Sequence, residues 1–145
     1  MTEVETFGRR PAVLTKRQVV RAVVSAVAAT RRKPEGAIVV VFVSGPTIRK
    51  LNREHRGKDQ TTDVLSFALV DFRVDHKRTS LRAGDLFIAP SYVKQDALKA
   101  GEDFKTQLIR VIVHGTLHLM GLDHVKPAEE KRMFALQERT LKKIL

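Results

Sequence analysis

The segment that most restricts the fold is residues 108–122, LIRVIVHGTLHLMGL, in which Arg110 is the only charged side chain. A helix that is apolar on nearly all sides is stable only where neighbouring elements bury it. The chain therefore needs a fold that surrounds this helix with other layers. Its 145 residues suffice for one such domain, so we expect a single domain over residues 1–145.

The remaining pattern places strands early and helices around and after them. Strand patterns lie at residues 2–7, 37–43, 62–70 and 84–88. Helical periodicity covers residues 15–31, 46–56, 91–100, 103–120 and 128–144. Thr15 and Gln18 have capping-box spacing, Ser44 is a candidate N-cap, and the charged segment 73–82 is expected to be a loop. This order predicts an α+β fold with a small mixed sheet packed with helices.

The chain carries a large positive charge. It has 27 Lys and Arg against 16 Asp and Glu, a net charge of +11 and a pI near 10.4. A nucleic acid is the first partner to expect, and the alternative is a basic surface that contacts only solvent. With one Tyr and no Trp, contacts with phosphates are expected rather than an array of stacked bases.

The hydropathy pattern indicates neither a membrane protein nor a secreted one. The longest apolar run, residues 37–43, is far shorter than the ~18 residues that cross a bilayer. The first residues, MTEVETFGRR, lack the basic and then apolar order of a secretory signal. We expect a cytoplasmic protein with no membrane contact.

Three histidines gather in and just after the apolar segment. His114 and His118 are four residues apart, so on a helix they share one face. Gly121 offers a helix end, after which His124 can reach the same point from the following loop. The alternative is three core histidines that each have a separate partner.

The chain has no cysteine, so a metal must be held by His, Asp or Glu. Three neutral imidazoles with an open fourth position are typical of a catalytic zinc site, where a zinc-bound water becomes a nucleophile near neutral pH. We predict one Zn²⁺ per chain, held by His114, His118 and His124. The metal site would thus lie on a buried helix and the loop after it.

The histidine spacing matches that of metzincin proteases except at one residue. Those proteases place a glutamate, their general base, directly after the first histidine, where this chain has Gly115. Peptide hydrolysis would lack its proton acceptor, which disfavours a zinc protease. A base or charge stabiliser must come from elsewhere, or from a substrate phosphate, and we assign no protein base.

Two arginines are candidates to bind a phosphate. Arg56 precedes Gly57 at an expected helix end, where its guanidinium fork can be offered to a phosphate. A helix C-terminus also favours an exposed arginine through its dipole, which is the competing interpretation. Arg110 falls near the ligand face of its helix and is a weaker candidate.

Three aspartates are candidates to accept a hydrogen bond from the ring N–H of a metal-binding histidine. Asp63 and Asp85 flank apolar strand residues, and Asp123 is adjacent to the third histidine. For Asp63 and Asp85, capping of a strand edge is the competing interpretation. His55 and His76 lie in polar surroundings and are expected on the surface.

Taken together, these motifs resemble the YbeY family of bacterial metal-dependent endoribonucleases. The resemblance covers residues 51–67, LNREHRGKDQTTDVLSF, residues 84–88, and the block HGTLHLMGLDH at residues 114–124. The order and size of the whole chain agree with it. It implies an α+β fold and a zinc ion held by the three histidines. It also places Arg56 at the arginine of the family's N-x-x-Y/F-R-G-K-D element.

The resemblance further implies a single-strand-specific endoribonuclease that acts in 3′-end maturation of small-subunit rRNA and in ribosome quality control. The expected partners are single-stranded RNA, rRNA and the ribosome. The sequence does not distinguish two groups that could attack the scissile phosphorus, namely the zinc-bound water and the ribose 2′-OH. The alternative function is a non-catalytic RNA-binding ribosome-assembly factor with a structural metal. The lack of a fourth protein ligand speaks against it, because structural zinc sites are usually closed.

The chain departs from the family pattern at a few positions. His55 stands where the family usually has an aromatic residue, and Thr61 and Ala68 stand where it often has prolines. No ligand is lost, so these differences concern loop stiffness. Residues 73–82 are basic where many relatives are acidic, so the resemblance does not extend to substrate contacts in that segment.

Overall fold

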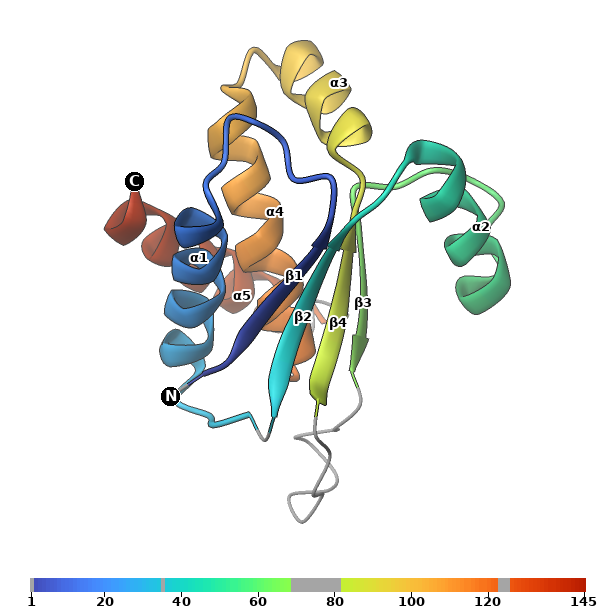
Figure 1. Cartoon of the computed structure of the whole chain (residues 1–145). Helices are drawn as coiled ribbons and strands as arrows, with labels where there is room; N and C mark the ends of the chain where they lie inside the picture. Colours follow the sequence, from blue (N-terminus) through green and yellow to red (C-terminus); the bar gives the residue numbers. More distant parts are fainter. Residues whose placement is uncertain (1, 35, 69–81, 123–125) are drawn as a thin grey trace.

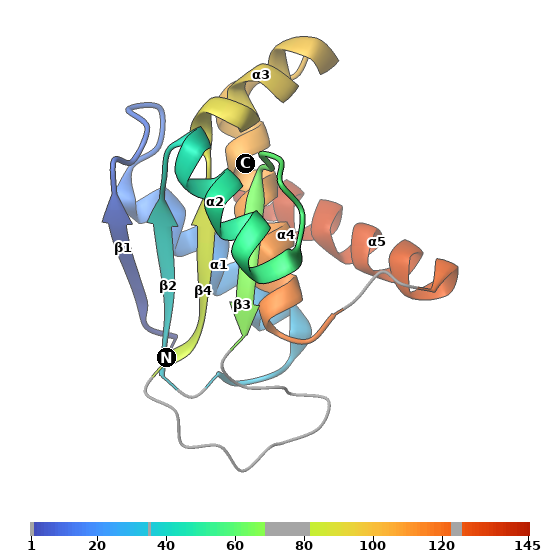
Figure 2. The same cartoon turned by 90° about the vertical axis from the view of Figure 1, so that its right-hand side faces the viewer.

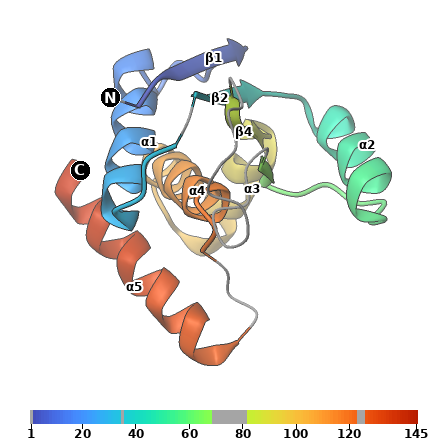
Figure 3. The same cartoon turned by 90° about the horizontal axis from the view of Figure 1, so that it is seen from below.

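The computed structural model describes residues 2–34, 36–68, 82–122 and 126–145. One four-stranded sheet carries α1 and α4 on one face and α2 on the other, while α5 packs against α1 and α4 (Figures 1, 2 and 3). The elements are β1 (Val4–Gly8), α1 (Lys16–Thr30), β2 (Ala37–Phe42), α2 (Gly45–Arg56), β3 (Val64–Ala68), β4 (Arg82–Ile88), α3 (Pro90–Ala100), α4 (Phe104–Leu119) and α5 (Pro127–Ile144). The predicted α+β fold is confirmed.

The sheet is mixed, as predicted, with the strand order β1-β2-β4-β3. β1, β2 and β4 run parallel, whereas β3 is antiparallel to β4 and forms one edge of the sheet. Side chains alternate between the two faces along each strand. On β4, Leu86 and Ile88 join the core beneath α1 and α4, while Phe87 joins a smaller cluster with Ile48 of α2.

The chemistry of the helix ends explains why most boundaries fall where the sequence predicted them. The Thr15 side chain accepts a hydrogen bond from the Gln18 amide, and the Gln18 side chain accepts one from the Thr15 amide, which completes the capping box of α1. The Ser44 side chain caps α2, which ends before Gly57 at a φ of 70°.

The prediction of a loop over residues 73–82 is wrong at its last residue, because Arg82 is the first residue of β4. Its backbone pairs with Ala37, which extends the parallel ladder with β2 beyond the apolar residues that suggested a start at Gly84. The pairing of a neighbouring strand therefore overrode the charged composition. Residues 73–81, and residues 69–70 of the strand expected at 62–70, lie outside the described residues.

α4 is the buried helix that the sequence required, and two glycines let it approach the sheet closely. A Cβ at Gly115 would lie 2.9 Å from Cδ2 of Leu86 and 3.1 Å from Cγ2 of Val64. A Cβ at Gly84 on β4 would lie 2.6 Å from Cδ2 of Leu119, near the end of α4. Each glycine therefore provides space for a leucine of the opposing element.

Within the described ranges, no helix is long and apolar enough to cross a membrane. The most apolar helix, α4, is instead enclosed by protein, since it packs against α1, α3, α5 and two strands of the sheet. Its histidine-bearing end is thereby fixed by contacts on several sides.

Candidate metal centre

The two described histidines of the predicted site lie together near the C-terminal end of α4. The ring centroids of His114 and His118 are 4.7 Å apart, and the ring planes meet at 76° in an edge-to-face arrangement. Both residues are half-buried. Two adjacent imidazoles from one helix face are the arrangement that a shared cation requires, so these residues fit the predicted zinc ion.

The third predicted ligand, His124, and the neighbouring Asp123 lie outside the described residues. Among the described residues, no group of three His, Asp or Glu side chains could hold a metal ion. The three-histidine ligand set therefore stays a prediction, of which the structure describes two members.

His114 is held from the side of α5 by two residues. Its Nδ1 atom lies 2.7 Å from Oε1 of Gln137, within hydrogen-bond distance. The ring of Phe134 stacks on the imidazole with centroids 6.2 Å apart and an interplanar angle of 23°. Gln137 is 5% exposed, so its amide is a buried polar group with a defined partner.

Gly115 stands where the proteases with this histidine spacing carry their catalytic glutamate, and packing explains the difference. Besides the contacts with Leu86 and Val64, a Cβ at this position would lie 3.3 Å from Oγ of Ser66. The Ser66 hydroxyl also donates to the Gly115 carbonyl at 3.1 Å. The sheet occupies the space that a glutamate side chain would need, so this position cannot supply a base.

Arg56 ends α2 beside the edge strand β3. Its Nη2 donates to the Ser66 carbonyl at 2.7 Å, and its guanidinium lies over the Phe67 ring, with Cζ 5.6 Å from the centroid. Since the Ser66 hydroxyl bonds to the residue after His114, one residue of β3 connects Arg56 to the histidine helix. Arg56 is exposed, and within the described ranges it makes no ion pair.

The other two arginines of α2 are engaged with a carboxylate. Arg49 donates to both oxygens of Asp59, at 2.8 and 3.2 Å, and Arg53 lies 3.6 Å from Asp59. The hydrogen bond from Arg49 lowers the pKa of the Asp59 carboxyl and so favours the ionised form that pairs with both arginines. Arg56 thus differs from its neighbours in having its charge available to a ligand.

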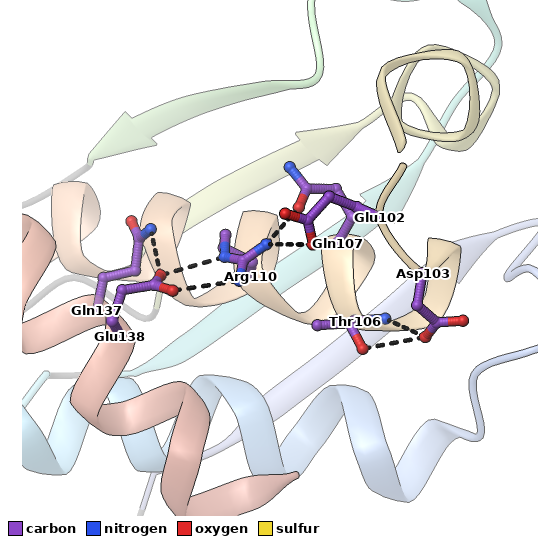
Figure 4. Close-up of polar contacts among 7 residues, drawn as sticks. All are labelled: Glu102, Asp103, Thr106, Gln107, Arg110, Gln137 and Glu138. Atoms are coloured by element: carbon purple, nitrogen blue, oxygen red, sulfur yellow. Dashed lines mark hydrogen bonds and ion pairs between the residues drawn. The ribbon is translucent and has the colours of Figure 1, made fainter. Parts of the chain in front are cut away.

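Arg110, the second predicted phosphate-binding arginine, is occupied by protein groups (Figure 4). Its Nε and Nη2 each donate to a Glu138 oxygen at 3.1 Å, and its Nη1 donates to Gln107 and lies 3.6 Å from Glu102. Burial raises the pKa of the Glu138 carboxyl, but hydrogen bonds from Arg110 and Gln137 outweigh it, so the pKa lies below its ordinary value. This engagement counts against a phosphate-binding role for Arg110.

The described aspartates lie on strands beside the site. Oδ1 of Asp63 accepts from the Val64 amide at 2.7 Å, which is the strand-capping role considered as the alternative. Strand alternation places Asp85 on the face of Phe87, opposite to Leu86, which packs against α4. A contact between either aspartate and a metal-binding histidine stays a prediction.

The two remaining histidines were expected on the surface. His55 is exposed and stacks edge-on against the Phe67 ring, with centroids 5.1 Å apart. It therefore lies on the surface, as expected, and its ring still contacts the sheet edge. His76 lies outside the described residues.

Gln137 is the site residue that the sequence interpretation missed. A signal was present, because Gln137 lies on the buried stripe of α5 with Met133 and Leu141, at helical spacing. A polar side chain on an apolar stripe needs a buried partner, but the sequence does not say which one.

The fold and the site define a small α+β protein whose buried helix α4 carries a histidine pair, and an arginine at the sheet edge is linked to this helix through Ser66. The family model described as endoribonuclease YbeY matches residues 9–145. The chain belongs to this family of enzymes, which confirms the resemblance noted from its motifs.

Individual relatives agree with this membership. The chain is 40% identical over 114 residues to endoribonuclease YbeY of Lysinibacillus sphaericus, a match that covers 75% of this chain and 73% of the relative. It is 43% identical over 120 residues to endoribonuclease YbeY of Geobacillus thermodenitrificans, covering 79% and 77%. The solution structure of TM1509 from Thermotoga maritima has the same fold, with a TM-score of 0.65, 24% identity and coverage of 97% and 88%.

Proposed function

We propose that this protein is a zinc-dependent endoribonuclease that cleaves single-stranded RNA in the cytoplasm. It would act on ribosomal RNA at the ribosome, in 3′-end maturation of the small-subunit rRNA and in ribosome quality control. The observation that carries the proposal is the contact between His114 and His118 on a buried helix, to which Arg56 is linked through Ser66 of β3. Membership of the endoribonuclease YbeY family supports the reaction class.

His114 and His118 would hold the zinc ion together with His124. A bound Zn²⁺ supplies positive charge and lowers the pKa of the water it binds to about 7. His114 and His118 come from a helix fixed between the sheet and three other helices, so their relative position is set before metal or substrate arrives.

Arg56 would bind the phosphate that is cleaved. Its guanidinium is exposed and rests on the Phe67 ring, and it can exchange the Ser66 carbonyl for the oxygens of a phosphate. Hydrogen bonds between two charged groups are about twice as strong as neutral ones, and the guanidinium fork matches two phosphate oxygens. Because these oxygens gain charge during cleavage, Arg56 would bind the transition state more tightly than the substrate.

The net charge of +11 supports a polyanionic substrate over a small neutral one. RNA binding is therefore expected to weaken as salt rises, since each neutralised phosphate releases counterions. A single-stranded chain is the substrate most easily bent around one arginine and one metal, because it carries no paired strand.

We expect Arg56→Ala to lower kcat/KM for a labelled single-stranded RNA oligonucleotide by about 100-fold, in line with the loss of one transition-state donor. Arg56→Lys is expected to recover only part of this loss, because it keeps the charge without the fork. The measurement is the initial cleavage rate, with duplex RNA and a chelator-treated sample as references.

Arg53→Ala is the matched control, since it removes the same charge from the same helix at a residue paired with Asp59. It is expected to change the rate only a few-fold. Equal losses in the two variants would show that Arg56 contributes only general charge. RNA that is bound by the wild-type protein but left intact, with zinc present, would instead indicate the RNA-binding assembly factor.

A further inference from the structure

We infer that Gln137 is a positioning residue for the proposed zinc site, whose amide oxygen holds the proton of His114 on Nδ1 and thereby directs Nε2 toward the metal. The inference rests on the proposed function and goes beyond it, because it assigns a role to α5. That helix contributes no histidine.

The first step concerns the orientation of the Gln137 amide. Its nitrogen, Nε2, donates to Oε2 of Glu138 at 3.1 Å, and Glu138 is held in place by two hydrogen bonds from Arg110, as Figure 4 shows. An ionised carboxylate accepts hydrogen bonds and cannot donate them. The amide nitrogen must therefore face Glu138, and the amide oxygen is left to face His114.

The second step concerns the tautomer of His114. An amide oxygen only accepts, so the Nδ1 atom that lies 2.7 Å from it must carry the proton. In a neutral imidazole the other nitrogen, Nε2, then has the free electron pair that a metal ligand needs. Metal-binding histidines commonly donate their second ring N–H in this way, which fixes both tautomer and ring orientation.

The third step concerns the ring plane. Phe134, which precedes Gln137 by one helical turn, stacks on the His114 ring at a centroid distance of 6.2 Å. The hydrogen bond with Gln137 and the stacking of Phe134 come from the same face of α5. A single helix therefore restrains both the rotation and the tilt of the His114 imidazole. The ion pair between Arg110 and Glu138 fixes that face of α5 against α4. Arg110 lies on α4 one helical turn before His114, so this contact is close to the histidine.

The experiment compares zinc affinity among three full-length variants by competition with a chromogenic chelator. Gln137→Leu keeps the side-chain size but removes the acceptor, and is expected to bind zinc 10–100-fold more weakly than the wild type. Gln137→Glu keeps an acceptor for His114 but replaces the donor to Glu138 with a second carboxylate, so it is expected to recover only part of the affinity lost in Gln137→Leu. Thr140→Val is the matched control and is expected to bind zinc normally. The substitution removes a hydroxyl from the buried stripe of α5, and among the described residues this hydroxyl bonds only to the Leu136 carbonyl.

A second readout follows the tautomer directly and does not depend on catalysis. In metal-free ¹⁵N-labelled protein, the ring nitrogens of His114 are expected to report a proton on Nδ1 in the wild type and in Gln137→Glu, because both offer an acceptor to Nδ1. In Gln137→Leu the signal of the Nε2–H tautomer should become prominent. Circular dichroism of each variant verifies that the fold is intact.

The possible outcomes distinguish a failure of the role of Gln137 from a failure of the proposed zinc-dependent function. Wild-type protein that binds zinc, together with a Gln137→Leu variant of equal affinity and unchanged tautomer, overturns the role of Gln137 alone. An equal loss in Thr140→Val overturns it as well, because the effect would then belong to general packing of α5. A wild-type protein that binds no zinc overturns the proposed function, and the inference with it.

Discussion

His118→Ala is expected to abolish stoichiometric zinc binding and to lower RNA cleavage by more than about 100-fold, since even groups that only orient a ligand are worth 10–100-fold. The physical reason is that His118 lies against His114 on one helix face, so its loss leaves only two of the three predicted ligands. The measurement is metal content by mass spectrometry on untagged protein, wild type beside variant, followed by cleavage rates. One zinc per wild-type chain is the expected value.

His55→Ala provides the control for metal content, because it removes an exposed histidine from α2 and should leave zinc binding intact. Two results would contradict the proposal. Zinc retained in His118→Ala would place the metal elsewhere, and a wild-type protein free of metal under metal-replete conditions would remove the catalytic role. The better account would then be an RNA-binding assembly factor, which the basic charge also suits.

Gly115→Ala is expected to destabilise the protein by about 1–3 kcal/mol, the usual cost of overpacking a well-filled core. The added Cβ would lie 2.9 Å from Leu86 and 3.1 Å from Val64, and both neighbours belong to the sheet against which α4 packs. Gly115→Glu should be worse, since it forces a charge into the same space, and should yield little folded protein. The measurement is urea denaturation followed by circular dichroism.

Gly45→Ala is the matched control, because a Cβ there would meet nothing closer than 3.8 Å and the backbone needs no left-handed conformation. Its stability is expected to stay within about 1 kcal/mol of the wild type. A folded, stable Gly115→Glu protein would show that the absent glutamate is not explained by packing. Its activity on a peptide substrate would then be the next measurement.

Sequence patterns predicted the fold where local chemistry decides the structure. The capping box of Thr15 and Gln18, the Ser44 cap and the Gly57 end of α2 are local signals, and each marks a boundary that the structure confirms. The start of β4 could not be predicted in this way. Arg82 is in a strand because β2 offers it a partner, and Ala37 lies far from it in the sequence.

In the candidate site, too, local contacts could be predicted from the sequence and long-range contacts could not. Helical spacing alone places His114 and His118 on one face, and the structure brings their rings together. The partners of Arg110 and His114 are long-range, since Glu138 and Gln137 lie on another helix whose approach depends on tertiary packing. For that reason the sequence offers Arg110 only as a weaker candidate to bind a phosphate, and nothing local to Gln137 indicates its contact with His114.

The hydrogen bond from Arg56 to the Ser66 carbonyl also affects whether two copies of the chain can pair through their sheets. β3 is an edge strand, and an uncovered edge is a template on which a second chain can add a strand. A charged side chain bound to an edge carbonyl blocks such pairing. Removing it in Arg56→Ala should therefore favour self-association, so size-exclusion chromatography belongs beside every rate measured on that variant.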